Sequence, residues 1–218
     1  MCGKFTQRHT WPQIWRQLNA IANADGVTTS TPMREAAILH LDAAGARAFT
    51  PMRWGFAAKN SKTPERLGHV HARSETIDAL PTFADAFAHR RGVLIVETFN
   101  EGEELPNGKT KQYVIRPKDG RPLGIAVIYE GWTNGAERLE TFVMVTTPPN
   151  PLIAAITDRM PAILREEDWP LWLGETDAPL ADVKALLRPM EDAGEWEMTP
   201  QDAPRSGRRA PDGQPGLF

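Results

Sequence analysis

Cys2 is the only cysteine of the chain, and it follows Met1 directly. We expect Met1 to be removed, because aminopeptidases tolerate a small second residue, and Cys2 would then carry an amine and a thiol on adjacent carbons. This 1,2-aminothiol attacks an aldehyde first as an imine and then by thiol closure to a five-membered thiazolidine. Ordinary pKa values of about 8 for the amine and about 8.5 for the thiol leave reactive fractions of both near neutral pH. Cys2 could also act as an N-terminal nucleophile whose own amine is the base.

Two polar segments could line a cleft beside such a group. In residues 71–76 the side chains of His71, Arg73 and Glu75 alternate, so an extended chain would place them on one face. A solvated strand edge explains this alternation equally well. The acidic segment 97–104 follows the aliphatic run 93–96, where a carboxylate at the end of a buried strand would have a raised pKa suited to proton transfer. The alternative for this segment is a solvated acidic loop.

Two arginines stand in short motifs that could contact phosphate. Arg53 precedes Trp54 and Gly55, and this motif could present a cation and a flat ring, although a core tryptophan beside a surface arginine is the commoner arrangement. Arg159 follows Asp158 and precedes Met-Pro. Its guanidinium could bridge two loops or hold a phosphate, whose geometry it matches.

Composition limits the classes of protein that this chain can represent. With 218 residues, 41% hydrophobic and 24% charged, it is predicted to fold as a globular domain with a proper core. No apolar run of eighteen residues or secretory leader is present, so we expect no membrane contact and a cytoplasmic, reducing location. One cysteine and five scattered histidines predict no metal and no cofactor. The net charge of −3 argues against a high-affinity duplex binder but permits a basic cleft.

Hydrophobic periodicity and turn residues predict an α+β fold with a mainly antiparallel β core and flanking helices. Helices are expected at residues 11–23, 81–90, 166–173 and 179–187, and a loop at 57–68. Strands are expected at 36–41, 48–56, 93–96, 112–116, 123–129 and 141–146. The dipeptides Asn107-Gly108 and Asp119-Gly120 predict hairpin turns. Residues 1–199 form the predicted single domain, and residues 200–218 a flexible tail.

Read together and in order, these motifs resemble the SRAP family, the SOS response-associated peptidase proteins, from Met1 to about Met198. The family opens Met-Cys-Gly-Arg-Phe, and this chain matches it with Lys4 in place of the arginine. The family's Arg-Trp-Gly occurs at residues 53–55, its Asn-Ala-Arg-x-Glu-Thr at 71–76 and its His-x-Arg-Met-Pro at 157–161. Its glutamate after an aromatic-rich strand end corresponds to Glu101. The resemblance implies a single SRAP-like domain with a barrel-like core.

The resemblance also implies a function, namely processing of abasic sites in single-stranded DNA during the DNA damage response. The amine of Cys2 would form a Schiff base with the ring-opened deoxyribose, and its thiol would close a thiazolidine that cross-links protein and DNA. Glu101 would shuttle protons, and autocatalytic removal of Met1 would account for the peptidase label. The implied enzyme has cross-linking or lyase-type activity and a self-peptidase, hydrolase activity. Phosphate contacts would come from Lys4, Arg53, Arg73 and Arg159, whereas Trp54 is expected to pack in the core.

Two substitutions depart from the family's pattern. His71 stands where the family has asparagine, and Thr157 where it has the histidine that serves the acid–base steps. Threonine donates a hydrogen bond but does not titrate near pH 7. Our hypothesis is that His71 supplies the lost imidazole, so that Cys2, Glu101, His71 and Thr157 form the catalytic group. The alternatives are a branch that cross-links but reverses poorly, or one with another aldehyde substrate.

The end of the chain indicates a partner. Gln214, Leu217 and Phe218 resemble the peptide by which bacterial repair proteins dock on the replication sliding clamp. We therefore expect a monomer that contacts abasic single-stranded DNA and possesses a clamp-binding tail.

Two other classes of protein remain open. Class II glutamine amidotransferases also begin Met-Cys-Gly and use Cys2 as an N-terminal nucleophile, but their Asn-Gly segment is missing and Lys4-Phe5 replaces their usual aliphatic continuation. A non-catalytic DNA-binding module is disfavoured by the net charge and by the lack of a helix-turn-helix or zinc motif.

Overall fold

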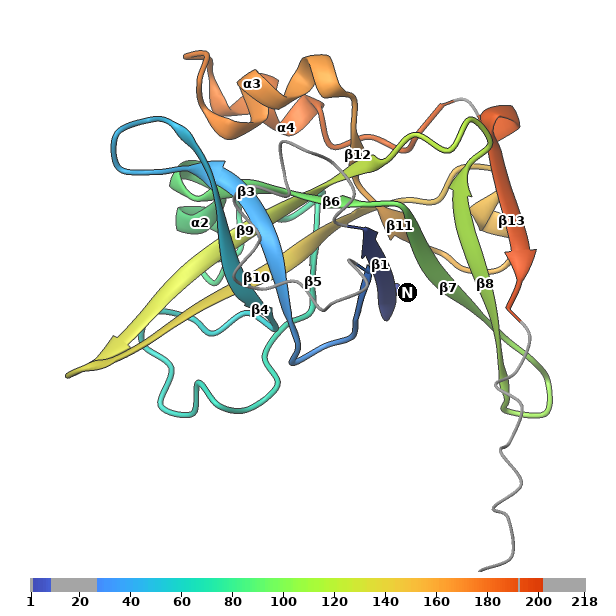
Figure 1. Cartoon of the computed structure of the whole chain (residues 1–218), viewed down its shortest axis with the longest axis horizontal. Helices are drawn as coiled ribbons and strands as arrows, with labels where there is room; N and C mark the ends of the chain where they lie inside the picture. The colour runs from blue at the N-terminus through green and yellow to red at the C-terminus, as the bar shows by residue number, and fades with distance from the viewer. Residues whose placement is uncertain (1, 9–26, 192, 202–218) are drawn as a thin grey trace, which may run out of the picture.

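The structure contains two β-sheets that enclose a common cluster of buried side chains, and the amino-terminal strand belongs to the smaller sheet (Figure 1). The structure is a computed structural model that describes residues 2–8, 27–191 and 193–201. The helix predicted at residues 11–23 and the tail after residue 201, with the peptide predicted to bind a sliding clamp, lie outside the described residues.

The smaller sheet is entirely antiparallel and contains five strands. Its order is β13 (Trp196–Pro200), β8 (Thr110–Pro117), β7 (Thr98–Glu104), β1 (Lys4–Arg8) and β2 (Val27–Ser30). The acidic segment 97–104 is therefore mostly a strand, and its reading as a loop is wrong. Burial divides the strand, because Phe99, Asn100 and Glu101 are buried while Gly102 to Glu104 are more exposed.

The larger sheet closes on itself. It runs β11 (Met160–Pro161), β10 (Glu137–Thr147), β4 (Arg47–Trp54), β3 (Glu35–Leu41), β6 (Arg91–Val96), β9 (Leu123–Asn134) and β12 (Ile163–Leu164). Because β9 also pairs with β10, the strands β10, β4, β3, β6 and β9 form a closed five-stranded barrel. The predicted α+β fold with a barrel-like core is confirmed.

Two short parallel pairings interrupt the antiparallel pattern. β4 lies parallel to β10, with Phe142 opposite Trp54, and β5 (His71–Arg73) lies parallel to β10, with Met144 opposite His71. These long-range pairings bring two of the sequence motifs to one strand. The loop predicted at residues 57–68 connects them, and a single bridge from Phe56 to His69 closes it.

The helices are shorter than predicted, and they pack on one side of the barrel sheet (Figure 1). They are α2 (Ala84–His89), α3 (Trp169–Leu173) and α4 (Leu180–Ala185), with 3-10 turns η1 (Ile153–Ala155), η2 (Glu166–Asp168) and η3 (Ala193–Glu195). Pro170 in the first turn of α3 and Gly174 after it, with φ +93, bound the single turn of that helix. No helix of the described ranges has the length and apolar character needed to span a bilayer.

One predicted hairpin is wrong. Asn107-Gly108 does turn β7 into β8, as predicted. Asp119-Gly120 also forms a turn, in which the N–H of Gly120 donates to the carbonyl oxygen of Pro117. The strands on either side of it, β8 and β9, belong to different sheets, so this turn carries the chain from one sheet to the other.

Successive residues of a strand serve different parts of the core. In β6, Val93 and Ile95 pack with the helices, whereas Leu94 and Val96 pack toward the smaller sheet and Cys2. Gln7 in β1 joins the two sheets, because its side-chain amide donates to the carbonyl oxygens of Ala37 at 3.3 Å and Ile95 at 2.9 Å. The amino-terminal strand is thereby fixed against both sheets.

Candidate active site around Cys2

Cys2 lies fully buried just before β1, in the cluster that the two sheets enclose. Its thiol points to the carbonyl oxygen of Lys4, 3.5 Å away. Burial is the main reason that the pKa of the thiol is raised to about 12, and the negative charge of Glu101 adds to it. The thiol is therefore protonated at neutral pH while Met1 is attached and the segment is closed.

Glu101 projects from β7 into the same cluster and is 1% exposed. The antiparallel register that sets Lys4 opposite Asn100 brings the next residue of β7 against the segment before β1. Burial raises the pKa of the Glu101 carboxyl to about 7, although the nearby N–H groups of Cys2 and Gly102 act in the opposite direction. A carboxyl that titrates near neutrality beside Cys2 has the properties of a general acid or base.

His71 closes the other side of Cys2. Its Nε2 lies 2.8 Å from the carbonyl oxygen of Cys2 and donates to it. Burial lowers the pKa of His71 to about 4, and the nearby charge of Arg159 acts in the same direction, so the ring is neutral at pH 7. Cys2 thus contacts both a titrating carboxyl group and a neutral imidazole.

Trp54 supports this arrangement from the core. It is fully buried, its ring stands edge-on to that of His71 with centroids 6.1 Å apart, and it also packs on Phe5 at 5.3 Å and Phe142 at 6.3 Å. Its indole N–H donates to the carbonyl oxygen of Val70 at 2.9 Å. The prediction that Trp54 packs rather than stacks on a base agrees with this burial.

Arg159 bridges two loops. It is 7% exposed, and its Nη2 donates to Glu75 Oε2 at 2.8 Å and to the carbonyl oxygen of Thr146 at 2.7 Å, while Nη1 pairs with Glu75 Oε1. This hydrogen bonding lowers the pKa of Glu75 to about 2. The alternation predicted for residues 71–76 holds only to Arg73, because β5 ends there and Glu75 lies in the following turn.

The remaining candidate residues differ in their exposure and in their hydrogen bonds. Arg73 is exposed and Lys4 is half-buried in β1. Arg53 donates through Nη2 to the carbonyl oxygens of Pro64 and, at 3.4 Å, Gly55, so it caps the loop over residues 57–68. Thr157 is half-buried just after η1, and its N–H donates to the carbonyl oxygen of Ile153 at 3.0 Å.

Two contributors to the site were missed from the sequence. The backbone N–H of Asn100 helps to lower the pKa of the Cys2 thiol, although burial outweighs it. The carbonyl of Val70 receives the Trp54 indole and so fixes the residue before His71. Both act through backbone groups, which are the same for every residue type, so the sequence could not have revealed them.

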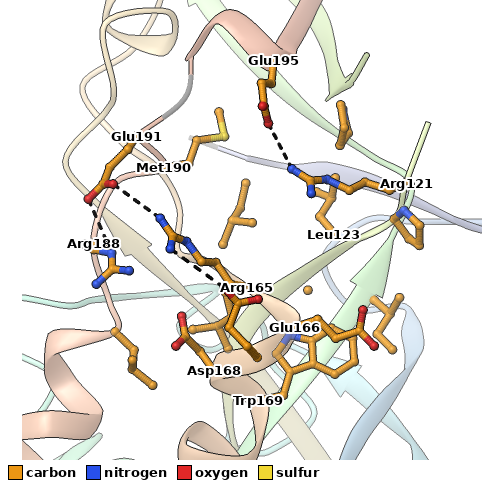
Figure 2. A pocket seen from close by; sticks show the side chains of 18 of the residues that line it. Arg121, Leu123, Arg165, Glu166, Asp168, Trp169, Arg188, Met190, Glu191 and Glu195 are labelled. Carbon is orange, nitrogen blue, oxygen red and sulfur yellow. Dashed lines mark hydrogen bonds and ion pairs between the residues drawn. The ribbon is translucent and has the colours of Figure 1, made fainter. Parts of the chain in front are cut away.

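A cavity of about 490 Å³ lies away from this cluster, and Cys2, Glu101 and His71 do not line it. Leu123, Trp169 and Met190 contribute apolar surface. Ion pairs cross its rim: Arg121 with Glu195 at 3.3 Å, Arg165 with Glu191 at 3.5 Å and Arg188 with Glu191 at 3.8 Å (Figure 2). Within the described ranges, no group of three or more His, Cys, Asp or Glu side chains is arranged to hold a metal ion.

The fold is a closed β-barrel with a second sheet beside it. The site is a buried cysteine near the amino terminus, with a carboxyl group on one side and an imidazole on the other. These two features define the class of protein. Residues 1–202 match the family described as SOS response associated peptidase (SRAP), and the chain belongs to this family.

Named relatives match over different lengths. Abasic site processing protein YoqW of Bacillus subtilis (strain 168) is 33% identical over 150 residues, which cover 67% of this chain and 66% of YoqW, just under two thirds of that relative. Abasic site processing protein YobE of the same organism is 29% identical over 206 residues, or 90% of this chain and 92% of YobE. Abasic site processing protein HMCES of Xenopus tropicalis is 26% identical and is covered over 51% of its length.

Solved structures share the fold. A protein from Bordetella bronchiseptica superposes with a TM-score of 0.76 at 22% identity, covering 93% of this chain and 100% of that one. A protein from Bacteroides thetaiotaomicron superposes with a TM-score of 0.71 at 21% identity, covering 89% and 84%. At these identities the likeness concerns the fold alone.

Proposed function

We propose that this protein processes abasic sites in single-stranded DNA by forming a covalent thiazolidine cross-link through Cys2. The observation that carries the proposal is the burial of Cys2 against Glu101, whose carboxyl titrates near neutrality. The names of the relatives YoqW, YobE and HMCES support the substrate class.

The proposed reaction needs a free amine on Cys2, so hydrolysis of the Met1–Cys2 peptide bond comes first. The amine then adds to the aldehyde carbon of the ring-opened deoxyribose, and loss of one water gives the imine. The thiol sulfur adds to the imine carbon, and its proton passes to the nitrogen to close the thiazolidine. The sum is aldehyde plus aminothiol giving thiazolidine plus water.

Glu101 is proposed to move protons in these steps. In its acid form it protonates the hydroxyl group that leaves as water, and in its base form it receives the thiol proton. A pKa of about 7 keeps both forms populated at neutral pH. Thr157 stands in place of the family's histidine, and His71 is proposed to supply the lost imidazole. The Nε2–H group of His71 donates to Cys2, so Nδ1 is the ring nitrogen whose lone pair is free to accept a proton.

The proposed DNA contacts are Lys4, Arg53, Arg73 and Arg159. Arg73 is exposed and therefore best placed for a phosphate, whereas Arg159 would contribute its charge from within its pair with Glu75. We further propose that the protein acts as a monomer and that Gln214, Leu217 and Phe218 dock on a sliding clamp. Deletion of residues 214–218 should abolish clamp pull-down without changing cross-linking.

The deciding experiment incubates the purified chain with a single-stranded oligonucleotide that carries one abasic site. We expect a band shift that survives heating in denaturant, that disappears in Cys2→Ala, and that is absent with an undamaged oligonucleotide. Intact mass should first reveal the loss of one methionine residue, because retained Met1 blocks the amine. Ammonia release from glutamine without DNA, together with no band shift, would instead support the amidotransferase-like alternative.

A further inference from the structure

The contact between His71 and Cys2 uses an unusual part of the cysteine. His71 does not contact Cys2 through the thiol but through the backbone carbonyl oxygen, at 2.8 Å from Nε2. Of the polar groups of Cys2, the nitrogen is released from Met1 and then attacks the aldehyde in the proposed reaction, and the sulfur closes the ring. The carbonyl oxygen takes part in neither step.

This contact also fixes the tautomer of His71. A carbonyl oxygen only accepts hydrogen bonds, so Nε2 must carry the hydrogen. The ring is neutral, because burial lowers the pKa of His71 to about 4. The charge of Arg159, which precedes β11, also acts on the ring and lowers its pKa further, whereas the charge of Glu101 in β7 acts on the thiol of Cys2. The contact is therefore stable across the neutral range.

His71 is itself fixed on two sides. Its strand β5 pairs parallel with β10, where Met144 lies opposite His71. Trp54 stands edge-on to the imidazole. Its indole N–H also donates a hydrogen bond to the carbonyl oxygen of Val70, the residue before His71. Trp54 also packs on Phe5, three residues beyond Cys2, so one buried ring supports both partners of the contact.

We propose that His71 is a positioning residue that holds Cys2 by its carbonyl oxygen and thereby keeps the amine and thiol placed while both of them react. The catalytic importance of this contact rests on the proposed function. The contact itself, a hydrogen bond from His71 to the carbonyl oxygen of Cys2 that we call the grip, exists without DNA. Since the carbonyl is retained when Met1 leaves and when the thiazolidine closes, the same hydrogen bond persists from the uncleaved chain to the cross-link.

The grip is tested by alkylation of Cys2 with iodoacetamide, followed by intact mass. Cys2 is the sole cysteine, so each added group reports on it. The buried thiol reacts only after local opening of the segment around Cys2, and loss of one hydrogen bond that holds it closed should raise the open population about fivefold. We therefore expect His71→Leu to be alkylated about fivefold faster than wild type.

Matched variants keep the test sharp. In His71→Gln the side-chain nitrogen is as many bonds from Cα as Nε2 of histidine, so this variant should return the rate to within about twofold of wild type. His89→Leu removes an exposed histidine and should leave the rate unchanged. Equal rates for wild type and His71→Leu, or no rescue by His71→Gln, would overturn the proposal even if His71→Leu folds less well.

Nitrogen-15 spectra of the histidine rings give a second readout, with His71 assigned by its absence in His71→Gln. We expect hydrogen on Nε2 and none on Nδ1 from pH 5.5 to 8, and hydrogen on Nδ1 alone would overturn the proposal. The abasic-site assay separates the proposed function from the positioning role of His71. If His71 protects Cys2 from alkylation but no cross-link forms, the proposed function fails and the positioning role is supported. If a cross-link forms but wild type and His71→Leu are alkylated at equal rates, the positioning role fails and the proposed function is supported.

Discussion

Glu101 lies buried against Cys2, and its negative charge raises the pKa of the neighbouring thiol. The same carboxyl is proposed to assist the thiol chemically, so its two effects on Cys2 have opposite signs. The charge of Glu101 disfavours the thiolate form of Cys2 in the resting protein. Proton transfer by Glu101 promotes the reaction of Cys2 with an aldehyde.

Substitution of Glu101 by glutamine should separate these effects. Removal of the charge lowers the pKa of Cys2, so the ultraviolet absorbance of the thiolate should appear at a lower pH in Glu101→Gln than in wild type. Its rate of cross-linking to abasic DNA should fall by about 100-fold or more, because the proton shuttle is gone. Glu103→Gln, in the same strand and bonded to Tyr113, serves as the control. A Cys2 pKa in Glu101→Gln that is no lower than in wild type would contradict the electrostatic argument.

Glu101 should also make folding stability depend on pH. Its pKa rises from an ordinary 4.5 to about 7 on folding, so the native state binds the proton more tightly than the unfolded state. The stability that follows from this is full below pH 4.5 and is lost as pH rises through 7. Glu101→Gln should therefore match wild type near pH 4.5 and exceed it by about 3 kcal/mol at pH 8. Urea unfolding at the two pH values measures the difference, and equal gaps at both would refute it.

The pair of Arg159 and Glu75 should show the opposite pH dependence. The pKa of Glu75 is lowered to about 2, so its contribution is present above pH 4.5 and is lost as pH falls through 2. Because the Glu75 side chain is 45% exposed, solvent screening limits the expected loss in Glu75→Gln to about 1 kcal/mol at pH 7. Glu191→Gln, which breaks only exposed pairs, should cost less than about 0.5 kcal/mol. A deficit for Glu75→Gln that persists at pH 2 would exclude this origin.

An exchange of imidazoles tests the roles proposed for His71 and Thr157. His71→Asn removes the Nδ1 base and should slow cross-linking or its reversal at neutral pH, by about tenfold. Thr157→His in the same chain places an imidazole where the family has one, and should restore most of the rate. Single-turnover cross-linking from pH 5.5 to 8.5 measures both, and unchanged rates in His71→Asn would remove His71 from the acid–base steps.

Gly68 tests the link between β4 and β5. A Cβ atom there would lie 1.9 Å from the carbonyl oxygen of Phe56, whose N–H is bonded to the carbonyl of His69. Gly68→Ala must therefore displace this bridge, and we expect a loss of about 2 kcal/mol or more in urea unfolding. Gly194→Ala, where no atom lies within 4 Å, should change stability by less than about 0.5 kcal/mol. Equal stability of the two variants would contradict the predicted clash.

Local patterns predicted the strands well where periodicity and turn residues agreed. The strand at 36–41, the turn after it and the hairpin at Asn107-Gly108 match the structure because each depends on neighbouring residues. The turn at Asp119-Gly120 was recognised but its consequence was not, since strand pairing is decided by distant partners. The helices were overextended because single turns are stabilised by packing on the barrel rather than by propensity.

The candidate site was only partly predictable for the same reason. The aliphatic run 93–96 predicted a raised pKa for a carboxyl group in segment 97–104, and the resemblance to the SRAP family pointed to Glu101, which is buried with a raised pKa. That Arg159 bridges two loops was one of two alternatives from the sequence, but its partners Glu75 and Thr146 could not be named, since they are 84 and 13 residues away. The grip of His71 on a backbone carbonyl depends on the parallel register of β5 on β10, which no local pattern encodes.

The parallel pairing of β5 with β10 has a consequence for biosynthesis. The strand that seats His71 includes Met144, which is made 142 residues after Cys2. At translation rates of about 5–20 residues per second, on the order of ten seconds separate the two. During that interval His71 lacks the strand on which it is seated. The order of synthesis therefore delays assembly of an aldehyde-reactive site until most of the chain exists.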